Sequence, residues 1–95
     1  MFTIYRLDTK EYAHTIVEKD DAPPIVTWRP YPEVEGYIDE FEDAVSLAQD
    51  IVKFILQREG ITVRLQVFEI AADGSPKMER ILFDTGDGRL SRGIN

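Results

Sequence analysis

The sequence predicts an α+β fold, in which one long amphipathic helix packs on a four- or five-stranded, mostly antiparallel sheet to form a two-layer sandwich. Two observations support this prediction. Runs rich in β-branched and aromatic residues lie before and after a single long segment with helical periodicity. With one helix only, the chain lacks the repeated crossovers that parallel strands require. The expected order is β-β-(β)-α-β-β, in one domain that spans residues 1–84.

The N-terminal third predicts a hairpin followed by an edge strand. Residues 2–7 (FTIYRL) and 11–18 (EYAHTIVE) have the composition of strands, and the polar residues between them favour a turn. Pro23 and Pro24 lack the amide hydrogen that a central strand needs. We therefore expect residues 25–29 to form a third strand at the edge of the sheet.

A helix is predicted from about Asp39 to Glu59. Asp39 and Glu42 have the spacing of a capping box, and carboxylates near a helix N-terminus interact favourably with its dipole. Gly60 is placed to end the helix in a left-handed conformation. The apolar residues of this segment cover an arc of roughly 200°, about twice the stripe that a surface helix needs. Another element or another molecule must cover part of this arc.

Residues 61–70 predict a strand with an irregular pattern. Its first inward positions are expected to be Ile61, Val63, Leu65 and Val67. The phase slips at Phe68, which indicates either a bulge there or a strand buried on both faces. Residues 73–76 are a strong turn signal, and residues 77–84 are expected to return as a partner strand. Residues 85–95 hold three glycines and little to bury, so we expect a flexible C-terminal tail.

The composition excludes several classes of function. The net charge of -7 disfavours nucleic-acid binding, which needs clustered cations. No stretch approaches the roughly 18 apolar residues of a membrane span, and the N-terminus lacks a signal-peptide pattern. A cytoplasmic protein that does not enter a membrane is therefore expected. The chain has no cysteine, which excludes disulfides, thiolate metal sites and a cysteine nucleophile.

The tripeptide Asp84-Thr85-Gly86 follows an apolar run and resembles the active-site loop of aspartic proteases, in particular the retroviral homodimeric type. The resemblance implies a pair of aspartates, one from each half, that share a proton. That family places its triplet early, before a flap and further strands, whereas nine residues follow Gly86 here. We interpret the tripeptide as a strand end that runs into a turn. The chain is expected not to be an enzyme.

His14 is the only histidine and the only candidate general base. No serine lies in a recognisable nucleophile motif, and we interpret His14 as a half-exposed strand residue. One histidine without cysteine leaves mainly carboxylates as ligands, so neither a metal site nor a cofactor is expected. We interpret the acidic residues 39–43 as charges that favour a helix N-terminus. The glycines of residues 86–93 precede no helix, which argues against a phosphate-binding loop.

Residues 28–37 (WRPYPEVEGY) are the most informative stretch for function. They combine Trp28, Arg29, Tyr31 and Tyr37, and these residue types are enriched at binding hot spots. The prolines between them reduce the ordering cost of binding. The same loop could instead fold back over the apolar flank of the helix.

The leading hypothesis is a small acidic interaction module that forms a homodimer. Its contact surface would use the aromatic loop, a helix flank such as Phe54, or the edge of a strand. The alternative is a small-ligand-binding regulatory domain, with a pocket between the loop and the helix. Trp28, Arg29, Tyr31 and Tyr37 would line that pocket, and Arg29 would bind an anionic ligand.

Overall fold

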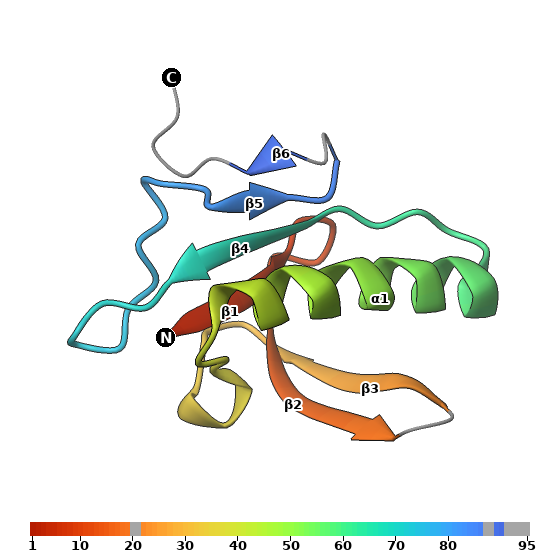
Figure 1. Cartoon of the computed structure of the whole chain (residues 1–95), viewed down its shortest axis with the longest axis horizontal. Helices are drawn as coiled ribbons and strands as arrows, with labels where there is room; N and C mark the ends of the chain where they lie inside the picture. The colour runs from red at the N-terminus through yellow and green to blue at the C-terminus, as the bar shows by residue number, and fades with distance from the viewer. Residues whose placement is uncertain (20–21, 87–88, 91–95) are drawn as a thin grey trace.

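The fold is a two-layer α+β sandwich, as the sequence predicts. The structure is a computed structural model that describes residues 1–19, 22–86 and 89–90. One antiparallel sheet forms the first layer, in the order β3-β2-β1-β4-β5-β6, and α1 crosses one face of it (Figure 1). The elements are β1 (Phe2–Arg6), β2 (Glu11–Lys19), β3 (Ala22–Arg29), η1 (Val34–Gly36), α1 (Phe41–Glu59), β4 (Leu65–Glu69), β5 (Phe83–Asp84) and β6 (Arg89–Leu90).

The first three strands follow the prediction closely. β1 and β2 form the expected hairpin, and β3 lies at the edge of the sheet beside β2. The sheet has six strands because the two-residue β6 pairs with β5, inside the segment 85–95 that was expected to be a tail. Residues 87–88 and 91–95 of that segment lie outside the described residues.

The start of α1 differs from the prediction. The helix begins at Phe41, its N-cap is Glu40, and no side chain caps it, so the capping box expected at Asp39 does not form. Its start is set by tertiary contacts instead. Ile38 exchanges two backbone hydrogen bonds with Phe2 of β1, at 2.8 and 2.9 Å. The Phe2 and Phe41 rings pack edge to face, with centroids 5.6 Å apart.

The end of α1 is the one that the sequence predicts. Gly60 has φ 74° and donates its amide hydrogen to the Leu56 carbonyl at 2.9 Å. A side chain at this φ is strained, although the space around Gly60 is open. We expect Gly60→Ala to lower the free energy of unfolding by about 1 kcal/mol. Urea unfolding measures this loss, and an unchanged midpoint would contradict a left-handed C-terminus.

Both faces of the central strands are buried. Toward α1 the core contains Ile4, Ala13, Ala44, Leu47, Ala48, Ile51, Ile55, Val63, Leu65, Val67 and Phe83. On the other face Thr3, Tyr12, Gln66 and Phe68 are also buried. β4 pairs with β1 in continuous register, so burial of both faces, and not a bulge, explains the phase slip at Phe68. Ile61 is exposed, against expectation, directly after the end of α1, whereas Val63, which also precedes β4, is buried as predicted.

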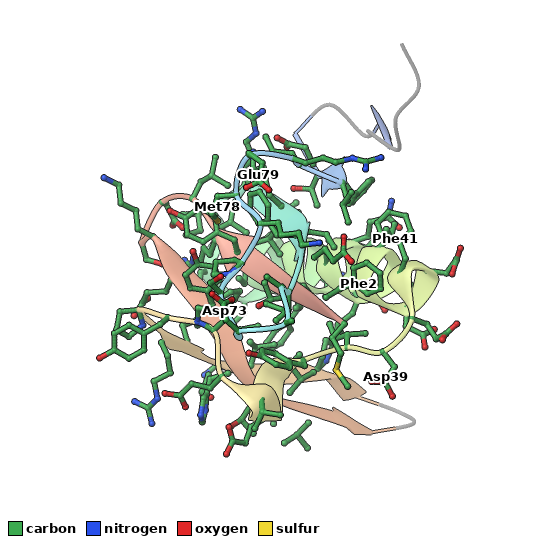
Figure 2. The ribbon with its side chains drawn as sticks, turned by 90° about the vertical axis from the view of Figure 1, so that its left-hand side faces the viewer. Phe2, Asp39, Phe41, Asp73, Met78 and Glu79 are labelled. Atoms are coloured by element: carbon green, nitrogen blue, oxygen red, sulfur yellow. The ribbon has the colours of Figure 1, made fainter. Side chains whose placement is uncertain are left out.

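The predicted strand over 77–84 was wrong for most of its length. Only Phe83–Asp84 forms a strand, while residues 70–82 form an irregular connection. The connection contains a turn at Lys77–Arg80, and Tyr12 donates a hydrogen bond to the Met78 sulfur at 3.3 Å. Figure 2 shows the connection at one end of the sheet, with Asp73, Met78 and Glu79 along it. Met78 of this connection thus covers part of the sheet face opposite the helix.

Candidate functional site

The structure separates the residues that were expected to form one site. Trp28 and Arg29 are consecutive in β3, so their side chains lie on opposite faces of the sheet. Trp28 pairs with Ala13 on the helix side, whereas Arg29 pairs with Tyr12 on the other side. Tyr31 is 64% exposed, and the Tyr37 hydroxyl donates to the Gly74 carbonyl at 3.2 Å.

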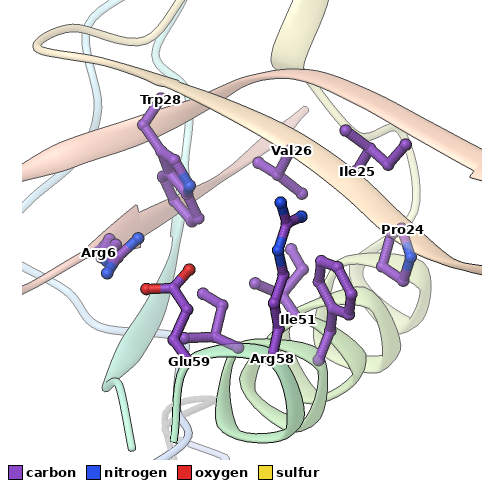
Figure 3. A pocket seen from close by; sticks show the side chains of 10 residues that line it. Arg6, Pro24, Ile25, Val26, Trp28, Ile51, Arg58 and Glu59 are labelled. Carbon is purple, nitrogen blue, oxygen red and sulfur yellow. The ribbon is translucent and has the colours of Figure 1, made fainter. Parts of the chain in front are cut away.

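Trp28 and Phe54 do come together, in a cleft between β3 and the C-terminal half of α1. The cleft has a volume of about 100 Å³, and the charged side chains of Arg6, Arg58 and Glu59 line it together with apolar ones (Figure 3). It is lined by Arg6, Pro24, Ile25, Val26, Trp28, Ile51, Phe54, Ile55, Arg58 and Glu59. This volume is smaller than the roughly 300–1,000 Å³ of small-molecule pockets. The cleft therefore has room for a side chain rather than for a cofactor.

Two arginines stand over the aromatic rings of the cleft. The Arg6 guanidinium lies 5.4 Å from the Trp28 ring centroid, and the Arg58 guanidinium lies 5.7 Å from that of Phe54. Arg6 is also bound to Asp8 through two hydrogen bonds, at 2.7 and 3.1 Å. Arg58 has no ion pair among the described residues. The cleft thus offers one cation to a partner, next to apolar surface.

β3 borders this cleft and forms one edge of the sheet. It pairs with β2 only, so its other side carries no strand in the described part of the chain. Pro23 and Pro24 lack the amide hydrogen, so the amides that β3 can offer to a further strand lie from Ile25 onward, on the side away from β2. Ile25 is 53% exposed, and its cross-strand partner Val17 is 42% exposed. An edge strand with exposed apolar side chains is a surface on which another strand can pair.

A second, larger groove lies between the η1 segment and the start of α1. Its volume is about 410 Å³, and it is lined by Ile16, Glu35, Tyr37, Ile38, Asp43 and Leu47. Of the four residues expected in a ligand pocket, only Tyr37 lines it. Its charged groups are the carboxylates of Glu35 and Asp43, and the residues that line it include no lysine or arginine. These charges suit a cationic ligand, whereas the sequence predicts an anionic one.

The Asp84-Thr85-Gly86 tripeptide begins at the last residue of β5, where Asp84 pairs with Gln66 of β4. The Asp84 side chain is only 6% exposed, and its oxygens accept hydrogen bonds from Arg64 at 2.7 and 2.8 Å. Further bonds come from the Gln66 amide at 2.8 Å and the Gly86 backbone at 2.7 Å. The Arg64 hydrogen bonds lower the pKa of Asp84 to about 2, with smaller contributions from Gln66 and Gly86.

Thr85 follows β5 and binds to the first residue of β4. Its hydroxyl accepts a hydrogen bond from the Leu65 amide at 2.9 Å, and its own amide donates to the Leu65 carbonyl at 2.9 Å. In the aspartic proteases that it resembles, the tripeptide holds the reacting carboxylate. Here the Asp84 carboxylate is engaged by four donor atoms of the same chain, in agreement with the interpretation as a strand end and turn.

His14 has two carboxylate partners that the sequence does not predict. Its Nε2 lies 2.6 Å from a carboxylate oxygen of Glu33 and 3.9 Å from one of Glu35. These residues are close because Gly36 packs directly on the β2 backbone, where a Cβ atom would collide with the Ala13 carbonyl oxygen. The signal in the sequence is this glycine, but its contact with β2 is not local. His14, Glu33 and Glu35 are the described residues best placed to hold a metal ion.

Comparison of the chain with known protein families, with curated proteins and with solved structures finds no match. Among the described residues, no helix is long and apolar enough to cross a membrane. Any functional assignment therefore depends on the geometry of the surfaces described above.

Proposed function

We propose that the chain is a small non-enzymatic interaction module that forms a homodimer through the edge of β3 and the adjoining cleft. The observation that carries the proposal is that the open edge of β3 adjoins a cleft with partly exposed aromatic side chains. An unpaired strand edge lies directly beside a cleft in which Trp28 and Phe54 are only half-buried. A second chain that pairs with β3 would extend the sheet and shield both aromatic side chains from water.

The charges of this surface favour a second copy as the partner. The chain carries a net charge of -7, so two copies repel each other over most of their surface. The cleft is different, because Arg6 and Arg58 lie there with Glu59 as the only carboxylate among its lining residues. A two-fold interface presents the same patch from both sides. The neighbouring Arg58 and Glu59 can then pair crosswise between the copies.

Phe54→Glu is expected to convert the dimer into a monomer. The substitution replaces an apolar ring at the centre of the proposed interface with a carboxylate, which must be desolvated there and competes with Glu59 of the second copy for Arg58. Leu56→Glu is the matched control, because it makes the same change on the same helix at an exposed position that does not line the cleft. Sedimentation equilibrium should give the monomer mass of 10.9 kDa for Phe54→Glu and twice that for Leu56→Glu. Equal masses for the two variants would contradict the proposed surface.

A small-ligand-binding regulatory domain is the second candidate function, and the 410 Å³ groove beside Tyr37 supports it. This volume lies within the range of small-molecule sites. Because Glu35 and Asp43 line the groove, the ligand should carry a positive charge. In a screen of small organic cations by NMR, a binder should shift the signals of Tyr37 and Leu47. Binders that shift only signals outside the groove would argue against this function.

The cytoplasmic location and the lack of nucleic-acid binding remain predictions from the composition. A shift of labelled RNA or DNA by the protein at about 150 mM salt would overturn the second of these.

A further inference from the structure

We propose that His14, Glu33 and Glu35 form a binding site for a divalent transition-metal ion of the zinc type. The three side chains come from β2 and from the η1 segment, and one ligand atom from each lies within 4.8 Å of the others. An imidazole and two carboxylates are ligand types that zinc accepts. This site does not depend on the proposed dimer, because none of its residues lines the cleft beside β3.

The backbone beneath the site is fixed before any ion binds. The Gly36 amide donates to the Glu33 carbonyl at 2.9 Å, and this hydrogen bond closes the turn that carries Glu33 and Glu35. The close approach of Gly36 to Ala13 holds this turn against the strand that carries His14. Binding a metal would therefore require side-chain adjustment and little ordering of the chain.

The separations between the His14 nitrogen and the two carboxylates are close to those of ligands on one zinc ion. Two ligands of a tetrahedral zinc ion, each about 2.0–2.2 Å from the metal, lie roughly 3.4 Å apart. His14 Nε2 lies 2.6 Å from Glu33 and 3.9 Å from Glu35, so the required separation falls between the two. At 2.6 Å a hydrogen must lie between the ring nitrogen and the Glu33 oxygen. The metal ion would replace that hydrogen.

The surroundings of His14 also suit a metal ligand. Its other ring nitrogen, Nδ1, lies 2.9 Å from the Thr15 hydroxyl, which holds the ring orientation. Histidines that bind metals usually have such a second partner. The His14 side chain is 16% exposed and that of Glu35 is 61% exposed, so solvent reaches the site. A water molecule could supply a fourth ligand.

The test is a titration of the chelator-treated chain with zinc chloride, followed by calorimetry and by NMR of the imidazole nitrogens. Since His14 is the only histidine, its nitrogen signals report on this site alone. We expect one zinc ion per chain and a shift of the Nε2 signal. His14→Asn and Glu33→Gln should each weaken zinc affinity by at least about 10-fold. Glu79→Gln, which removes an exposed carboxylate from the 70–82 connection, should leave the affinity unchanged.

Two results would overturn the site. The first is the lack of both heat and an Nε2 shift at millimolar zinc, which would leave His14 and Glu33 as an ion pair only. The second is zinc binding that His14→Asn retains in full, which would assign it to surface carboxylates elsewhere. Circular dichroism of each variant shows whether it is folded. Glu33→Gln provides an independent reading if His14→Asn does not fold.

Discussion

Gly36→Ala is expected to lower the free energy of unfolding by about 3 kcal/mol, at the upper end of the range for an overpacked site. A Cβ atom at this position would collide with the Ala13 carbonyl oxygen and would come within 2.8 Å of the His14 carbonyl oxygen. Both are backbone atoms of β2, so neither can rotate away. The η1 turn or the strand would have to move.

Urea unfolding of Gly36→Ala beside Val34→Ala measures this effect. Val34 lies in the same turn but is 67% exposed, so its truncation should change the stability by less than about 0.5 kcal/mol. A loss for Gly36→Ala no larger than that of Val34→Ala would mean that the turn does not pack tightly on β2. The metal site would then lose the fixed backbone on which it depends.

Asp84→Ala should also cost about 3 kcal/mol, because it breaks a partly buried ion pair by removing its buried partner. The Gln66 amide, in a residue that is only 8% exposed, would lose its acceptor, and Arg64 would lose two hydrogen bonds. We place the loss at the lower end of the usual range because the Arg64 side chain is 55% exposed and can be rehydrated. Thermal and urea unfolding both measure it. A loss below about 1 kcal/mol would contradict a structural role for this carboxylate.

The same carboxylate gives a signature in acid. The pKa of Asp84 is about 2 in the folded chain and ordinarily 3.8, so folding stabilises the ionised carboxylate relative to the protonated one. A depressed pKa contributes stability that is present above about pH 4 and is lost as the pH falls toward 2. The difference in stability between wild type and Asp84→Asn should therefore shrink by about 2 kcal/mol between pH 5 and pH 2. A difference that is constant over this range would mean that the Asp84 pKa is not lowered.

The sequence was sufficient for the fold class and most of its elements because these depend on local patterns. Strand composition predicted the β1–β2 hairpin, and the position of Gly60 predicted the end of α1. The start of α1 could not be predicted, since it depends on the Ile38 bridge to Phe2 and not on a capping side chain. The strand expected over 77–84 was wrong because Met78 packs against Tyr12, which lies far away in the sequence.

The candidate sites were less predictable because they are assembled from distant segments. Trp28 and Phe54 line the same cleft because α1 packs against β3, which depends on tertiary packing. The separation of Trp28 from Arg29 could have been predicted, since consecutive residues of a strand point to opposite faces. The meeting of His14 with Glu33 could not, because it depends on the contact between Gly36 and β2.

The measurement that tests the central proposal most directly is the mass of the wild-type chain in solution, by light scattering on a sizing column at two concentrations. Pairing through β3 predicts a mass that approaches twice 10.9 kDa at the higher concentration. A mass that stays at 10.9 kDa at both concentrations would contradict the homodimer. The edge of β3 and the cleft beside it would then be surfaces for a different partner.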